Sequence, residues 1–122
     1  MGGGAFSLVV SVAAAFVLSA CSESSEDRLT RLAKKALKEK SPSAELLSFE
    51  QAQTEFGVKS KECLTKQKRD FGIEMTRLYA FVKVDGETKV VAIDIKNKKD
   101  ESRVMSGFES VESFKKNFAN CF

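Results

Sequence analysis

The spacing of apolar and polar residues predicts a helix near the start of the folded part of the chain. Between residues 26 and 40, apolar residues recur at helical spacing and Lys and Arg fill the opposite side, which is the pattern of an amphipathic helix. Ser24 followed by Asp27 is a helix-start signal, and Pro42 ends the helix because the residue before a proline disfavours helical backbone. The apolar stripe is narrow and lacks aromatic residues, so we expect it to pack on a core rather than on a membrane.

The strongest pattern further along the chain is that of a β-hairpin. Two runs rich in β-branched and aromatic residues, about 75–84 and 87–95, flank Asp85-Gly86, and a two-residue Asp-Gly loop favours a type I′ turn. The register that this turn fixes places Arg77 opposite Asp94, as a cross-strand ion pair. Both faces of the hairpin carry apolar residues, which predicts a central position in a small sheet that is covered on both sides.

The C-terminal part of the chain predicts a closing helix. Ser106 followed by Glu109 matches a capping box, and apolar residues at near-helical spacing continue to about Ala119. The residues expected to enter the core from this helix are Phe108, Phe114 and Phe118. Residues 66–72, with a turn at 70–72, and the charged segment 96–103 are predicted as loops. The elements together indicate an α+β fold, a small domain with an N-terminal amphipathic helix, a central antiparallel hairpin and a C-terminal helix.

An uncharged apolar run, from Ala5 to Leu18, precedes the domain and is shorter than the roughly 20 residues that a spanning helix needs. It leads into Leu18-Ser19-Ala20-Cys21, which resembles the lipobox of bacterial lipoproteins. The resemblance implies that the chain is cut before Cys21 and that the sulfur of Cys21 is diacylated. The expected organisation is a signal peptide over 1–20, a lipidated tether over 21–27 and one periplasmic domain over 28–122.

Two details of this segment bear on where the protein would lie. Met1-Gly2-Gly3-Gly4 lacks the Lys or Arg that usually opens a signal peptide, which leaves an uncleaved membrane anchor with an incidental Cys21 as the alternative. Ser22 stands where the family has Asp in proteins retained at the inner membrane. We therefore expect a lipid-anchored, periplasm-facing protein of the bacterial envelope, at the outer membrane if the cell has two membranes.

The chain has three Cys and no His. With Cys21 assigned to lipid, Cys63 and Cys121 form an even pair, and such a pair in an exported chain usually forms a disulfide. The alternatives are a metal site or a catalytic thiol. The lack of His disfavours a zinc site and removes a Cys–His dyad, so we expect the disulfide and neither a metal nor a cofactor.

Charge and motifs narrow the function class further. The 20 basic and 17 acidic residues are intermixed and give a net charge of +3, which is too mild an excess to indicate nucleic-acid binding. The sequence has no glycine-rich phosphate loop and no Gly-x-Ser-x-Gly nucleophile turn. We therefore expect a protein that is not an enzyme.

Residues 28–84 also resemble a small uncharacterised domain of short bacterial and phage-associated proteins, many of them lipoproteins. The features that carry this resemblance are a Lys-rich helix, Ser41-Pro42-Ser43-Ala44, Cys63, Phe71-Gly72 and Phe81. The chain departs from that pattern at residues 73–75, where Ile, Glu and Met replace a second Gly and an aromatic residue. The resemblance implies an α+β fold.

The expected function is that of a membrane-anchored, non-catalytic protein-binding module, of the immunity, exclusion or inhibitor type common among small lipoproteins. The alternative is a structural or assembly accessory of an envelope complex. The hairpin brings the loops before Arg77 and after Ile95 to one end, so the candidate partner-binding residues are Lys68, Arg69, Phe71, Lys98 and Lys99. Two alternatives stay open: these loops are ordinary solvated loops with Phe71 at the edge of the core, or the contact lies on the basic face of the first helix.

Overall fold

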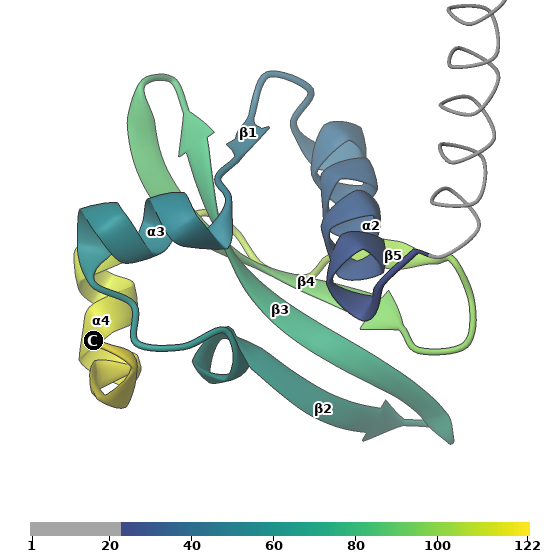
Figure 1. The fold of residues 1–122 in the computed structure, drawn as a ribbon. Coiled ribbons are helices and arrows are strands. Elements are labelled where there is room, and N and C mark those ends of the chain that lie inside the picture. Colours follow the sequence, from purple (N-terminus) through teal and green to yellow (C-terminus); the bar gives the residue numbers. More distant parts are fainter. Residues whose placement is uncertain (1–22) are drawn as a thin grey trace, which may run out of the picture.

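A long hairpin of strands β3 (Ile73–Val84) and β4 (Glu87–Lys96) forms the centre of the fold (Figure 1). The structure is a computed structural model and describes residues 23–122. The predicted register is confirmed, with Arg77 opposite Asp94. Asp85 and Gly86 have φ angles of 52° and 79°, as a type I′ turn requires.

Four short strands complete the antiparallel sheet within residues 23–122. Strands β1 (Glu45–Leu46) and β2 (Thr65–Asp70) both pair with β3, one after the other along the same edge. Strands β5 (Ser102–Val104) and β6 (Glu109–Ser110) pair in the same way with β4. The α+β class and the central hairpin predicted from the sequence are therefore present.

Helix α2 (Ser25–Lys40) covers one face of the sheet (Figure 1). The Ser24 hydroxyl accepts a hydrogen bond from the amide of Asp27 at 3.1 Å, which confirms the helix-start signal. The helix begins at Ser25, one residue before the predicted 26–40, so the tether expected over 21–27 overlaps its first turn. The buried side chains of the helix are Leu32, Ala33, Ala36 and Leu37, and they pack on the sheet as predicted.

The second face is covered by helices α3 (Phe49–Phe56) and α4 (Val111–Asn117), so both faces of the hairpin are at least partly covered, as predicted. The 3₁₀ helices η1 (Glu62–Leu64) and η2 (Ala119–Cys121) flank them. Aromatic rings fill this second core: Phe114 is fully buried, with its ring centroid 4.3 Å from that of Phe118. Phe108, expected beside them, packs instead against the core between α2 and the sheet.

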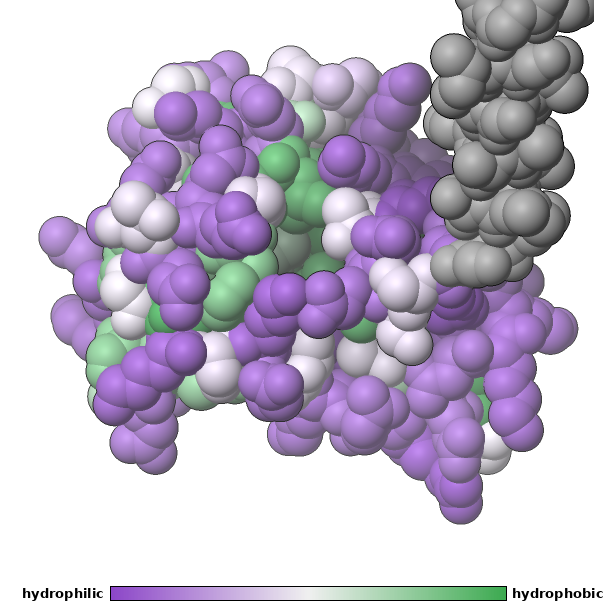
Figure 2. Space-filling model, in the orientation of Figure 1, coloured by the Kyte–Doolittle hydropathy of each residue, from purple (hydrophilic) through white to green (hydrophobic). Residues whose placement is uncertain are grey.

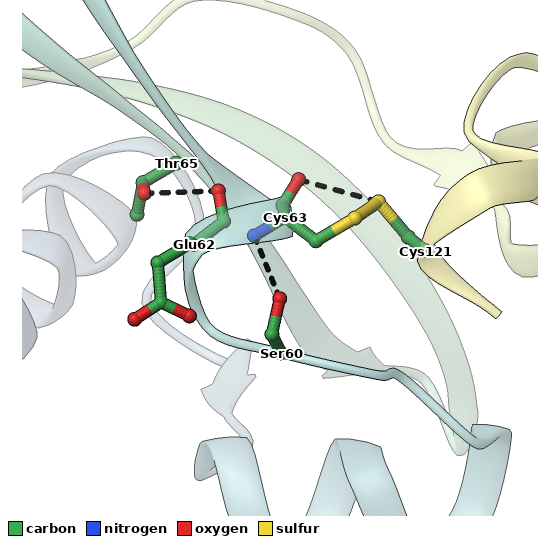
Figure 3. The surroundings of a disulfide bond; sticks show 5 residues. All are labelled: Ser60, Glu62, Cys63, Thr65 and Cys121. Atoms are coloured by element: carbon green, nitrogen blue, oxygen red, sulfur yellow. Dashed lines mark hydrogen bonds between the residues drawn. A yellow bond between two sulfur atoms is a disulfide. The ribbon is translucent and has the colours of Figure 1, made fainter.

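The disulfide between Cys63 and Cys121 is present and joins η1 to η2 (Figure 3). The amide of Lys59 donates a hydrogen bond of 2.7 Å to the carbonyl oxygen of Cys121, and the hydroxyl of Ser60 accepts one of 3.3 Å from the amide of Cys63. These contacts hold the C-terminal turn against the segment after α3. The predicted link between the chain's end and the Cys63 region is therefore confirmed.

Several predicted boundaries were wrong; among them, Ser102 and Arg103, expected in the 96–103 loop, lie in strand β5. Residues 65–70 form an edge strand rather than a loop, and the turn is the two-residue Phe71-Gly72. Helix α4 begins four residues later than expected, because its N-cap is Ser110 and not Ser106. Ser106, taken as that cap, accepts a hydrogen bond of 3.0 Å from the amide of Ala92, and the following residues pair with β4 instead of starting a helix.

Helix α3 was not predicted, although its ends carry clear signals. Ser48 and Gln51 form a reciprocal capping box, with bonds of 3.1 and 2.8 Å, and Gly57 ends the helix in the left-handed conformation. No helix among residues 23–122 is both long enough and apolar enough to cross a membrane.

Candidate functional site

We call the part of the molecule formed by the β2–β3 turn and the β4–β5 loop the basic end; it carries Lys68, Arg69, Phe71, Lys98 and Lys99. The structure brings the two segments together, since the amide of Asn97 donates a hydrogen bond of 3.1 Å to the carbonyl oxygen of Glu74. Beneath them, the buried hydroxyl of Thr76 donates to Asn97 at 2.8 Å and accepts from Gln67 at 3.0 Å. These contacts join β2, β3 and the loop, so the basic end is a fixed surface.

Phe71 lies at the tip of the basic end and is 97% exposed. Phe71 does not fill the edge of the core, so that part of the alternative is wrong, whereas the interpretation of these segments as ordinary solvated loops stays open. Its φ angle of 50° is unusual for a bulky residue, because the first position of a type I′ turn favours Asn, Asp or Gly. Ile73, two residues on, is 45% exposed. The tip therefore presents apolar side chains to the outside.

Lys68 and Arg69 differ in their surroundings. Lys68 lies toward one face of the sheet, where its ammonium is 3.5 Å from the buried carboxylate of Asp94, and Arg77 contacts that carboxylate at 2.7 Å. Burial raises the pKa of Asp94, but the hydrogen bonds and charges of Arg77 and Lys68 outweigh it and lower the pKa below its usual value. Arg69 is exposed and pairs with Glu74 at 2.5 Å. Lys68 thus supports the fold, whereas Arg69 belongs to the outer surface.

The start of α2 lies beside the basic end. The guanidinium of Arg31 contacts Glu23 at 2.8 Å and Asp100, in the β4–β5 loop, at 3.3 Å. The guanidinium of Arg28 donates to the carbonyl oxygens of Lys96 and Lys99 at 2.8 and 2.9 Å. The point at which the described chain begins is therefore fixed against the loop that carries Lys98 and Lys99. Cys21, the predicted lipidation site, lies outside the described residues.

A second feature, which sequence reasoning did not find, is a cleft of about 680 Å³ between α2 and α3. Figure 2 shows it as a hollow with apolar residues at its bottom and polar residues around it. The apolar lining includes Leu29 on α2, Leu46 before α3, Phe49 on α3, and Leu78 and Ala80 on β3. The cleft depends on how two helices sit over one strand, which no sequence pattern specifies.

The floor of the cleft contains a gap in the sheet. Strand β1 pairs with β3 at Val82 and Lys83, and β2 pairs with it no further than Leu78. Phe81 accepts one backbone hydrogen bond from Leu47, at 2.9 Å. Among the described residues, Tyr79 and Ala80 are thus without a strand partner on this edge, which leaves a short stretch of strand open to the cleft.

The rim of the cleft is mostly acidic. It carries four carboxylates and two ammonium groups: Glu26, Asp27, Glu50, Glu62, Lys34 and Lys61. Lys61 spans the rim, because it pairs with Glu26 of α2 at 2.8 Å and lies 5.6 Å from the ring centre of Phe49 on α3. The hydrogen bond from Lys61 to Glu26 raises the pKa of Lys61. An apolar floor beneath an acidic rim suits a segment that combines apolar and basic side chains.

Residues 23–122 contain no cluster of three or more His, Cys, Asp or Glu side chains placed to hold a metal ion. Comparison with protein-family models, with curated proteins and with solved structures finds no match to the chain.

Proposed function

We propose that this chain is a lipid-anchored protein of the bacterial envelope whose domain captures a protein partner without catalysis. The anchor is Cys21, within the sequence that resembles a lipobox. The observation that carries the capture function is the cleft between α2 and α3, with its apolar floor, acidic rim and open stretch of β3. Anchoring would hold this binding surface close to a membrane, as an immunity, exclusion or inhibitor protein requires.

The proposed occupant of the cleft is a short segment of the partner that carries an apolar side chain flanked by Lys or Arg. The apolar side chain would bury against Leu78 and Ala80, and the basic groups would face the rim carboxylates. An extended segment could also bond to the open backbone near Tyr79, in the manner of peptides that add to a sheet edge. The surface offered is small, so a few buried contacts would dominate the affinity.

The test is capture of the partner by full-length protein purified from its own envelope in mild detergent. Glu50→Lys changes the rim, whereas the matched control Glu55→Lys makes the same change on an exposed part of α3 that does not line the cleft. We expect the first variant to lose a partner that the second retains, with equal circular dichroism spectra. Equal capture by both variants would refute the cleft as the binding site.

The same experiment separates the alternative function. If the protein is a structural or assembly accessory, it would co-purify with a large membrane assembly. A binding module would instead retain one partner after the membrane is dissolved.

A further inference from the structure

We propose that the basic end docks on the anionic surface of the bilayer that holds the anchor, with Phe71 and Ile73 entering the headgroup region. The inference rests on the proposed lipidation of Cys21. It assigns the residues first considered for a protein partner to a lipid surface instead, and leaves the cleft for the protein.

The anchoring residue would lie beside the basic end. Two residues of chain span at most about 7 Å, so a lipidated Cys21 would hold lipid headgroups within that distance of Glu23. Glu23 is bonded to Arg31, and Arg31 contacts Asp100 in the β4–β5 loop. That loop is in turn bonded to Glu74, three residues from Phe71. A lipidated Cys21 would therefore place the anchor on the side of the domain where Figure 1 shows the start of α2, the β4–β5 loop and the β2–β3 tip.

The basic end combines exposed apolar and cationic side chains. Among the described residues, Phe71 is the most exposed of the large apolar side chains, and Ile73 beside it is nearly half exposed. Exposed cations lie close by, at Lys98 and Lys99, and at Arg69, whose charge is paired with Glu74. Interfacial surfaces of proteins combine apolar side chains that enter the headgroup boundary with Lys and Arg that attract anionic lipid.

The acidic groups nearby do not reverse this charge. Glu74 is paired with Arg69, and Glu101 is paired with Lys96. Asp100 is paired with both Arg28 and Arg31. Asp70 is exposed at the turn, and the two exposed lysines Lys98 and Lys99 outnumber it. The loop lysines therefore leave the basic end with a positive balance.

The backbone at the tip also favours contact with a membrane. Phe71 adopts a conformation that disfavours bulky residues, although it contacts no core. The hydrogen bonds of Thr76 with Gln67 and Asn97 hold the hairpin and the loop in place beneath it. Folding of the domain alone does not account for an exposed Phe at this position, whereas contact with a membrane does.

The chain contains no Trp, so a single introduced Trp reports on one position. The protein to be tested is the full-length acylated chain, reconstituted into vesicles of phosphatidylethanolamine and phosphatidylglycerol whose acyl chains carry bromine. We expect F71W to show blue-shifted emission that bromine quenches. The matched control is Gln53→Trp, at an exposed position of α3 remote from the tip, where we expect emission typical of water and no quenching.

Charge is tested in the F71W background. The double change Lys98→Gln and Lys99→Gln should reduce quenching in vesicles with phosphatidylglycerol, and the difference should vanish when phosphatidylcholine replaces it. The control pair Lys40→Gln and Lys59→Gln removes the same charge from exposed positions elsewhere and should leave quenching unchanged.

The possible outcomes distinguish membrane docking of the basic end from lipid anchoring and from partner capture. Vesicles that float with the protein but leave F71W unquenched would overturn docking and leave the anchor standing. Protein that does not float with vesicles would overturn both. Loss of partner capture in the Lys98 and Lys99 variant, with quenching unchanged, would assign the basic end to a protein instead.

Discussion

Loss of the disulfide is the perturbation whose effect on stability follows most directly from the structure. Cys63 and Cys121 are 58 positions apart, and they join η1 to η2 at the far ends of the second core. A crosslink that closes a loop of this size removes chain entropy from the unfolded state worth about 4 kcal/mol. For a domain of about 100 residues this corresponds to a fall in melting temperature of roughly 15–30 °C.

Replacing both cysteines by Ala should leave the folded state largely intact. The hydrogen bond from Lys59 to Cys121 involves only backbone atoms, and the packing of Phe114 and Phe118 does not depend on sulfur. The loss should therefore appear in the free energy of unfolding, measured by urea titration of the mature domain, with native circular dichroism retained. Ser60→Ala, which removes only the bond to the Cys63 amide, is the control and should cost less than about 1.5 kcal/mol. A double variant that loses less than about 1 kcal/mol would refute the entropic reasoning.

Three further predictions concern single residues. Asp94→Asn should destabilise the domain by about 2–3 kcal/mol, less than for a fully buried pair because Arg77 and Lys68 are partly exposed. Because the pKa of Asp94 is lowered in the folded state, the stability that this group contributes is present above its ordinary pKa of 3.8 and is lost as the pH falls through the lower folded value. Urea titrations from pH 7 to pH 3 should therefore show a smaller loss of unfolding free energy for Asp94→Asn than for the wild type. An equal loss in the two proteins would contradict the ion pair. Phe71→Asn should stabilise the domain by about 1 kcal/mol by relieving the positive φ angle, and a fall in melting temperature would argue against strain there. Phe114→Ala should cost about 3–5 kcal/mol in thermal or urea unfolding because this ring is fully buried, and a cost below about 1 kcal/mol would be inconsistent with the second core.

The hairpin could be predicted from the sequence because its two signals agree. The strands β3 and β4 are rich in β-branched and aromatic residues, and Asp85-Gly86 selects one turn type and hence one register. Strand β2 lacks the first of these signals, since Thr65–Asp70 contains no apolar residue and pairs only along an edge of the sheet. Its one signal was Phe71-Gly72, a two-residue turn whose first residue is atypical.

Capping patterns alone do not decide where a helix forms. Helix α3 is short, so its periodicity is weak, but Ser48, Gln51 and Gly57 mark both its ends. Ser106 and Glu109 match a capping pattern as well, yet the backbone around them bonds to β4. A local pattern selects a structure only where no strand competes for the same backbone groups.

The candidate site shows a similar division. The hairpin topology correctly placed the β2–β3 turn and the β4–β5 loop at one end. It could not show that Lys68 lies toward Asp94, because that depends on β2 being a strand, nor that Glu23 is fixed beside Asp100. The cleft could not be predicted either, since its walls come from α2 and α3 and its floor from β3.

The central claim is that the mature protein begins at a lipidated Cys21, on which both the anchoring and the docking proposals rest. The most direct measurement is mass spectrometry of the N-terminal tryptic peptide, which in a processed chain runs from Cys21 to Arg28. The account predicts a peptide that starts at Cys21 and carries the mass of a diacylglycerol on its sulfur. A peptide that extends to residues before Cys21, or one with an unmodified thiol, would contradict it.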